Sequence, residues 1–300
     1  MNSVKSFFFY AFLWLVRVTP AGLYFPFTRF GIRFFYALNP KAERYAVGTL
    51  SRVYGDQIGI AEKKRLARAS FLNLADGLAG FIFTFSRPEF SRGTFDLEGL
   101  DKLAAAKAAG KGAVIGIAHF GPFAWMMYRF IAEGYKAGVV AKPPRGEFLR
   151  GKFADAFRHI GLKVILSTPV RSCIVESIRA LNAGELLFMP VDQNYGAAGR
   201  IFVNFFGQPA ATAPGPVMYA QKTGAPLLMA FALPAGPNKF KIVIEGPLVL
   251  VKTGDERRDL VVNTQAFTAM VEKYVRQYPE QWSWLHRRWK CVPRENEGVL

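Results

Sequence analysis

One histidine of this chain occupies a position where side chains commonly do chemistry. His119 directly follows the apolar run GAVIGIA (112–118), which is typical of a buried parallel strand, and it opens the turn HFGPF. Binding and catalytic sites gather at the carboxyl ends of such strands. An imidazole titrates near neutral pH, so His119 is a candidate general base that takes a proton from a hydroxyl nucleophile. A histidine that only caps the next helix is the structural alternative.

A second polar cluster follows another apolar run. Asp192 and Gln193 open the sequence DQNYG directly after LLFMPV (186–191). Asp, Asn and Gly are also common in ordinary turns, so one such cluster alone is weak evidence for a site. Two strand ends with suitable side chains favour a site. A third segment, residues 202–215, has bulky apolar residues bracketed by Gly and Pro and fits either the wall of an apolar pocket or plain packing.

Several common catalytic motifs are absent from the sequence. It has no phosphate-binding glycine loop, no dinucleotide-binding glycine motif, no GxSxG and no HExxH. The three histidines lack acidic partners at ligand spacing, so we expect no metal and no bound cofactor. A total of two cysteines argues against a disulfide framework or a cysteine-based metal cluster.

The elements that would position these side chains alternate along the chain after residue 90. Apolar runs typical of strands alternate with helical segments, and this order predicts an α/β fold: a mixed, mostly parallel sheet flanked by helices. We expect residues 1–90 to form a helical, membrane-anchoring region and residues 91–300 to form the α/β domain. The expected strands are 93–99, 112–118, 137–142, 163–167, 186–191, 225–233 and 240–251, and the last helix is 255–278.

Charge and hydropathy together indicate a membrane surface. The 300-residue chain has 39 Lys and Arg against 22 Asp and Glu, a formal net charge of +17, yet 51% of its residues are hydrophobic. Its mean hydropathy is +0.13. A typical nucleic-acid-binding protein is basic but not this apolar, and no nucleic-acid-binding motif is present, so we expect no nucleic acid partner. A basic and apolar chain suits an anionic lipid surface.

The apolar excess begins near the N-terminus. Residues 7–16 read FFFYAFLWLV, and Arg17 and Pro20 interrupt the continuation to residue 27. The uninterrupted run is about half of the ~20 residues that a spanning helix needs. A span, an interfacial or re-entrant helix pair, and a buried helix of a soluble core are therefore all open. No small-residue cleavage site follows, so we expect this segment to be retained.

Short motifs along most of the chain resemble those of one protein family. The string PEQWSWLHRRWK (279–290) is the most specific, because so long a pattern is rarely met by chance. The others are LEGL (97–100), GKG (110–112), HFG (119–121), VDQ (191–193), FV (202–203), FFG (205–207), AT (211–212) and TGAP (223–226). In these residues the chain resembles the late lipid A acyltransferases, the bacterial lauroyl and myristoyl transferases of the lysophospholipid acyltransferase superfamily.

The resemblance implies a glycerolipid acyltransferase-like fold with an N-terminal membrane anchor, at the cytoplasmic face of the bacterial inner membrane. It implies transfer of a fatty acyl group from acyl carrier protein or coenzyme A, as co-substrate, to a hydroxyl of a lipid A precursor or related glycolipid. The carrier protein, membrane lipids and the glycolipid acceptor are the expected partners. An acyltransferase for a mannolipid, an ornithine lipid or a lysophospholipid remains open, as does a non-catalytic lipid-binding or carrier-interaction protein of the same fold.

The sequence departs from the family at one position of the expected site. In the family motif, His is followed after four residues by Asp or Glu, which implies that His119 is the base and that this acid orients its imidazole. Here that position is Ala124. Three explanations are open: an introduced substitution, another acid that takes its place, with Asp192 the nearest in kind, or a loss of catalysis. We favour the first and expect an impaired chain, because losing such an acid costs ~10⁴-fold in rate.

Basic residues are expected around the site. The family has an Arg downstream of the His that meets the acceptor phosphate or stabilises the oxyanion, and the matching interval holds Arg145, Arg158 and Arg171. With Lys142 they would form a basic mouth suited to a phosphorylated glycolipid or to the phosphopantetheine carrier.

Further contacts are expected from the same resemblance. We expect Gly121 and Gln193 to bind substrate. In the C-terminal block, we expect His286 to be structural, and Arg287 and Arg288 to lie at the membrane or at the acidic carrier protein.

Overall fold

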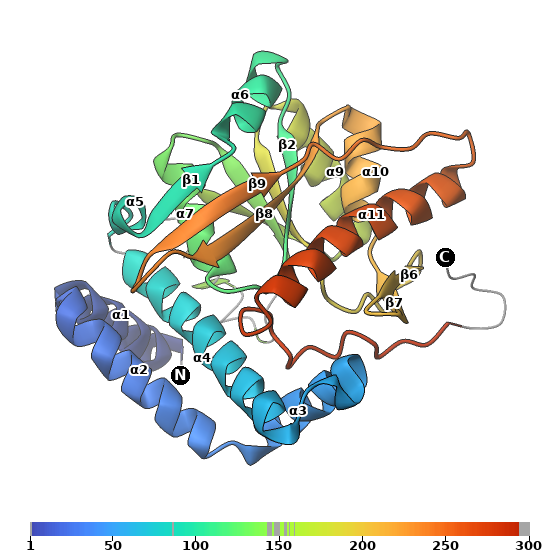
Figure 1. Ribbon diagram of the computed structural model, residues 1–300. Helices are drawn as coiled ribbons and strands as arrows, with labels where there is room; N and C mark the ends of the chain where they lie inside the picture. Colours follow the sequence, from blue (N-terminus) through green and yellow to red (C-terminus); the bar gives the residue numbers. More distant parts are fainter. Residues whose placement is uncertain are drawn as a thin grey trace.

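A mixed, mostly parallel sheet forms the centre of the protein. The computed structural model describes residues 2–85, 87–142, 146, 151–152, 155, 157–158 and 160–293, with side chains for residue 7 and from residue 9 onward. The seven strands run in the order β1-β9-β8-β2-β5-β3-β4 (Figure 1), and all pairs are parallel except the β8–β9 hairpin. The predicted fold class is therefore confirmed. The strands are β1 (Phe95–Glu98), β2 (Ala113–Ile117), β3 (Ala137–Ala141), β4 (Leu162–Leu166), β5 (Leu186–Pro190), β8 (Leu227–Pro234) and β9 (Phe240–Glu245).

Helices cover both faces of this sheet (Figure 1). Strand β2 shows why, because all five of its residues are buried, with Val114 in one core cluster and Ile115 and Ile117 in the other. A strand that is apolar on both faces needs a helical layer on each side. The helices on one face are α6 (Leu100–Ala108) and α7 (Phe123–Ala132), and those on the other are α9 (Val170–Asn182), α10 (Gly215–Thr223) and α11 (Glu256–Gln277).

Two segments form other strands than their apolar runs alone would predict. The run 240–251 was expected to be one strand, but β9 ends at Glu245, where Gly246 adopts a φ of 103° and Pro247 has no N–H to donate to a ladder. The segment after β5 forms a separate antiparallel hairpin of β6 (Ile201–Phe205) and β7 (Gln208–Thr212). Its turn residues Phe206 and Gly207 both have positive φ, as a tight two-residue hairpin turn requires.

Helices form the chain before the sheet. They are α1 (Asn2–Val18), α2 (Ala21–Ala37), α3 (Pro40–Tyr54), the short 3₁₀ turn η1 (Gly55–Gln57), α4 (Ile60–Thr84) and α5 (Phe90–Thr94). The Asn39 side chain accepts a hydrogen bond from the Ala42 N–H and so caps α3. Within the described residues, α4 is the one helix long and apolar enough to cross a membrane, but 39% of its apolar window is buried inside the protein. The domain boundary near residue 90 stays a prediction.

Two glycines let α4 approach the first turn of α7 closely. A Cβ atom on Gly80 would lie 2.1 Å from a ring carbon of Trp125, and one on Gly77 would lie 2.6 Å from the Cα of Pro122. Pro122 belongs to the HFGPF turn that follows β2. Helix α4 therefore packs against the same turn that carries His119.

We predict that Gly80→Ala destabilises the fold by about 1–3 kcal/mol, because the added methyl group overlaps the Trp125 ring in a packed interior. The matched control is Gly48→Ala in α3, where an added Cβ meets no atom within 4 Å. The control is expected to leave stability unchanged or to raise it by up to about 1 kcal/mol through helix propensity. Urea unfolding of both variants in the same detergent measures the difference, and equal midpoints would contradict the close-packing argument.

Candidate active site

The register of two neighbouring strands brings His119 and Asp192 together. Strands β2 and β5 pair in parallel with Ile117 opposite Pro190. His119 and Asp192 each follow two residues later, so both emerge side by side at the carboxyl edge of the sheet. The two strand ends that the sequence singled out thus form one site, at the edge where parallel sheets place their ligands.

The Asp192 carboxylate accepts three hydrogen bonds in a fully buried position. Its Oδ1 lies 2.9 Å from Nδ1 of His119, and its Oδ2 accepts from the backbone N–H of His119 at 2.9 Å and from Nε1 of Trp282 at 2.8 Å. The Asp192 side chain has no exposed surface, whereas 16% of the His119 side chain is exposed. Burial by itself would raise the pKa of this carboxyl, but the charges and hydrogen bonds of His119, together with His286, lower it well below its ordinary range.

An ionised Asp192 decides the tautomer of His119. A carboxylate can only accept, so Nδ1 of His119 carries a proton, and in the neutral imidazole Nε2 then holds the lone pair. The side-chain nitrogen of Gln193 lies 3.0 Å from that Nε2 and donates to it. The geometry therefore leaves the imidazole in the form that a general base needs, with its basic nitrogen covered by the exposed Gln193 amide until another donor displaces it.

The C-terminal segment holds the turn that carries His119. The N–H of Ser283 donates to the carbonyl oxygen of His119 at 3.0 Å, and the N–H of Gly121 donates to the carbonyl oxygen of Gln281 at 2.7 Å. Phe120 and Trp282 form an isolated antiparallel bridge between these contacts. Gly121 has a φ of 51°, and a Cβ there would lie 2.9 Å from the Gln281 side-chain oxygen, so this position requires glycine.

A second histidine lies against the first. The rings of His119 and His286 meet edge to face, with centroids 4.4 Å apart. Nε2 of His286 is buried and has no hydrogen-bond partner among the described residues. Burial is the main cause that lowers the pKa of His286 to about 4, so its ring is neutral at physiological pH.

Position 124 belongs to an apolar core cluster. Ala124 is in the first turn of α7, is 8% exposed and packs in the apolar cluster that contains Trp125 and Phe95. The carboxylate that contacts His119 is Asp192, which was the second of the three explanations offered for Ala124.

The basic residues expected around the site are distributed differently. Lys142 follows β3 at the same sheet edge and is exposed, Arg171 is exposed in the first turn of α9, and Arg158 pairs with Asp155 at the surface. Arg145 lies outside the described residues. Among the residues that the structure does describe, no hydrogen bond joins Lys142, Arg158 or Arg171 to His119 or Asp192.

A metal ion would compete with the hydrogen bonds of this site. Donor atoms of His119, Asp192 and His286 lie within 4.8 Å of one another, and two imidazoles with one carboxylate is a common ligand set. The His119 Nδ1 and both Asp192 oxygens are already engaged with each other and with Trp282. Ligation through Nδ1 of His119 would break its hydrogen bond to Asp192, and ligation through Nε2 would displace the Gln193 amide.

A cavity of about 270 Å³ lies between α2, α4, α7 and β9. Aromatic rings from α2, α5, α7 and β9 line it, together with the ion pair of Arg29 and Asp76. The segment 202–215, considered above as a pocket wall, does not line this cavity. The lining residues are Ala21, Gly22, Phe25, Pro26, Arg29, Asp76, Phe90, Trp125, Asn238 and Phe240.

Three contributors to the site were missed by reasoning from the sequence. Trp282, His286 and Arg288 all lie in PEQWSWLHRRWK, which was noted as a family pattern and not as part of the site. The sequence did contain a signal for their burial. This string combines Trp and His residues, which are more often buried than the residues of a surface segment.

We predict that the neutral His286 makes the fold less stable in acid. Its folded pKa of about 4 lies below the unfolded value near 6.5, so the unfolded chain binds a proton that the folded chain does not. The free energy of unfolding should therefore fall as pH drops from 6.5 towards 4, by up to about 1.4 kcal/mol per pH unit. In His286→Phe this slope should be reduced. Denaturant unfolding between pH 4.5 and 7 measures it, and parallel curves for both proteins would refute the prediction.

Known proteins similar to this chain include three acyltransferases. The chain is 24% identical over 240 residues to the lipid A biosynthesis palmitoleoyltransferase of Escherichia coli (strain K12), over 77% of this chain and 74% of that relative. It is 32% identical over 125 residues to the lipid A biosynthesis lauroyltransferase of the same strain, over 41% and 38%. It is 27% identical over 193 residues to the phosphatidylinositol mannoside acyltransferase of Mycobacterium tuberculosis (strain CDC 1551 / Oshkosh), over 64% and 58%.

The match to a family extends over nearly the whole chain. The sequence profile described as bacterial lipid A biosynthesis acyltransferase matches residues 2–291. This range includes the strand ends that carry His119 and Asp192 and the C-terminal segment that contacts both. The chain belongs to the bacterial lipid A biosynthesis acyltransferase family, as its motifs predicted.

Proposed function

We propose that the protein transfers a fatty acyl group from a thioester donor, acyl carrier protein or coenzyme A, to a hydroxyl of a lipid A precursor, with His119 as general base. Membership of the family supports acyl transfer to a glycolipid. The observation that carries the catalytic assignment is the 2.9 Å contact between His119 and the buried Asp192. No cofactor beyond the acyl donor is required by this reaction.

The reaction follows from the tautomer of His119. The acceptor hydroxyl displaces the Gln193 amide and donates its proton to Nε2, while its oxygen forms a bond to the thioester carbonyl carbon. The resulting imidazolium is stabilised by the adjacent Asp192 carboxylate. Collapse of the tetrahedral intermediate breaks the C–S bond, and the imidazolium returns the proton to the leaving thiolate. The products are one ester and one free thiol.

Asp192 is proposed to supply the acid that position 124 lacks. A carboxylate held by three donors keeps the imidazole in one tautomer and in one orientation, which are the two tasks of the acid in a His–carboxylate pair. With Asp192 in this role, Ala124 need not be an introduced substitution. The chain is then an active enzyme. This assignment replaces the expectation of impairment made from the sequence alone.

Two acceptor classes are supported by the relatives. The palmitoleoyl and lauroyl transferases are named for lipid A biosynthesis, and the profile that covers residues 2–291 carries the same description. The mycobacterial relative is named for a phosphatidylinositol mannoside. We therefore propose a lipid A precursor as the acceptor, and a mannolipid is the second candidate.

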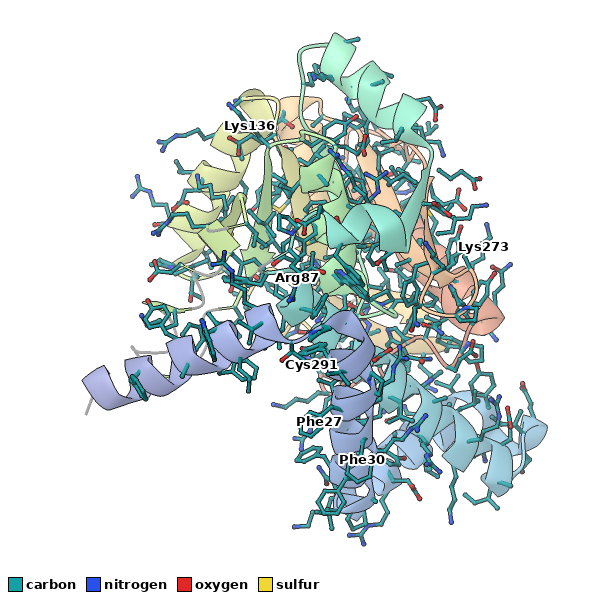
Figure 2. The ribbon with its side chains drawn as sticks, turned by 90° about the vertical axis from the view of Figure 1, so that its left-hand side faces the viewer. Phe27, Phe30, Arg87, Lys136, Lys273 and Cys291 are labelled. Carbon is teal, nitrogen blue, oxygen red and sulfur yellow. The ribbon has the colours of Figure 1, made fainter. Side chains whose placement is uncertain are left out.

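The N-terminal helices are proposed to attach the protein to the cytoplasmic face of the inner membrane. Large apolar side chains along α1 and α2 are exposed, and Figure 2 shows Phe27 and Phe30 lying on the outer side of α2 while α1 stands out from the body of the protein. Contiguous exposed apolar patches of this kind mark membrane or partner contacts. The exposed members are Phe7, Tyr10, Phe12, Trp14, Leu15, Val18, Leu23, Phe27, Phe30, Phe34, Phe35 and Leu38.

We predict that Asp192→Asn lowers kcat by about 10⁴-fold, because the amide no longer fixes the tautomer or offsets the imidazolium charge. Ala124→Glu should not raise the rate, since the new carboxyl would lie in an apolar cluster, and Ala124→Gln is its uncharged control. Acyl transfer to a lipid A precursor, followed by mass spectrometry, measures all three variants. A rate gain in Ala124→Glu with an active Asp192→Asn would show that position 124 is the missing acid.

We also predict that the double variant Phe27→Ser and Phe30→Ser binds vesicles at least about tenfold more weakly. Each Phe contributes roughly 1.5–3 kcal/mol when it leaves water, and both are more than two-thirds exposed. Val249→Ser, at an 88% exposed apolar position between β9 and α11, is the matched control. Flotation with vesicles that contain phosphatidylglycerol measures the binding. Equal loss in the control and the double variant would remove α2 from the proposed attachment surface.

A further inference from the structure

A guanidinium is buried directly behind the site. Arg288 is 1% exposed, although the sequence placed it at the membrane or the carrier protein, and this expectation is wrong. Its neighbour Arg287 is exposed, with its guanidinium 5.9 Å from the Tyr45 ring. A charge in the protein interior is costly unless it is well paired, so the burial of Arg288 needs an explanation.

The Arg288 hydrogen bonds join two segments of the chain. Nη1 donates to the carbonyl oxygen of Gln193 at 3.0 Å and to that of Ala211 at 2.7 Å, and Nη2 donates to the Thr212 hydroxyl at 2.6 Å. The first acceptor follows β5, and the other two lie in β7. The Phe205 ring covers the guanidinium, with the carbon of the guanidinium 5.3 Å from the ring centroid. Arg288 therefore ties the Asp192–Gln193 turn to the β6–β7 hairpin.

We propose that Arg288 is a positioning residue that sets the Asp192–Gln193 turn, and through it both hydrogen-bond partners of the His119 imidazole. The inference rests on the proposed function. Asp192 fixes Nδ1 and Gln193 covers Nε2, so a shift of this one turn misplaces both contacts at once. Arg288 touches neither the imidazole nor any reacting atom, and its effect passes through the Gln193 backbone.

Arg288 keeps its positive charge in this buried position. Burial lowers the pKa of Arg288 to about 10, and the nearby Asp192 opposes that change, so the group stays a cation at neutral pH. The cation faces neutral oxygens, and its Nε has no partner among the described residues. A fork of planar donors can reach two carbonyls and a hydroxyl together, which the single ammonium of a lysine cannot do with the same geometry.

The test compares Arg288→Met and Arg288→Lys with the control variants Arg257→Met and Arg257→Lys, at an exposed arginine in the first turn of α11, all in the full chain and the same detergent. Two readouts are combined: acyl-transfer kinetics over a pH range, and the tautomer of His119 by nitrogen-15 NMR of histidine-labelled protein. The chain has three histidines, so the His119 signal is identified by its loss in His119→Ala. Thermal melting reports folding in each case.

We expect a fall of about 10²-fold in kcat/KM for Arg288→Met, because misplacement of catalytic groups by about 1 Å costs this much. The His119 signal should change from the Nδ1–H tautomer to a mixture, Arg288→Lys should fall between wild type and Arg288→Met, and the Arg257 variants should match wild type. A lower melting temperature with an unchanged His119 tautomer and an unchanged kcat would overturn it and leave Arg288 as core packing.

Two further measurements cover the cases in which Arg288→Met does not fold or the wild-type protein is inactive. If Arg288→Met does not fold, Thr212→Val removes one acceptor while leaving the guanidinium in place, and it should give a smaller shift in the same direction; a wild-type tautomer and kcat in Thr212→Val would then count against the proposal. If the wild-type protein transfers no acyl group to the lipid A precursor, the proposed function fails. The NMR comparison still decides whether Arg288 sets the environment of His119.

Discussion

The buried Asp192 carboxylate is the contact that joins three separate parts of the chain. It accepts two hydrogen bonds from His119 at the end of β2, it lies at the end of β5, and it accepts a third hydrogen bond from Trp282 after the last helix. A buried carboxylate must have such partners, because an unpaired charge in the interior is strongly unfavourable. The two carboxylate oxygens of Asp192 therefore constrain the positions of both His119 and Trp282. The tautomer of His119 follows from the ionisation of Asp192, and the orientation of the C-terminal segment follows from the indole N–H of Trp282.

Much of the architecture could be predicted from local patterns. Continuous apolar runs such as AVIGI in β2 indicate a strand covered on both faces, and the alternation with helices indicates a parallel sheet. The polar residues at the ends of β2 and β5 could be identified as site candidates for the same reason. The pairing of His119 with Asp192 was one of three open explanations, and the sequence could not select it, because it depends on β2 lying next to β5 in a register of Ile117 with Pro190. Strand order is set by contacts between distant segments and leaves no local signal.

The remaining differences have a similar physical origin. An acid at position 124 was expected because of the spacing in a family motif, whereas the carboxylate in the structure comes from a residue 73 positions after His119. Arg288 looked like a surface residue because charged side chains usually are, and its burial depends on acceptors offered by β7 and by the Gln193 turn. Arg158 and Arg171, which matched by interval alone, are exposed. The burial of charged side chains, and the partners that they contact, thus depended most on tertiary contacts and were the hardest features to predict.

The C-terminal contacts of the site also have a consequence for the order in which the enzyme is made. Residues 281–288 supply the indole donor to Asp192, the N–H that binds the His119 carbonyl, and the Arg288 guanidinium. A nascent chain that has emerged only as far as β7 contains both His119 and Asp192 but none of these three contacts. Because domains fold from the N-terminus during synthesis, the apolar helices α1 and α2 emerge long before the site can be completed. The site is therefore completed only by residues that are among the last to be made.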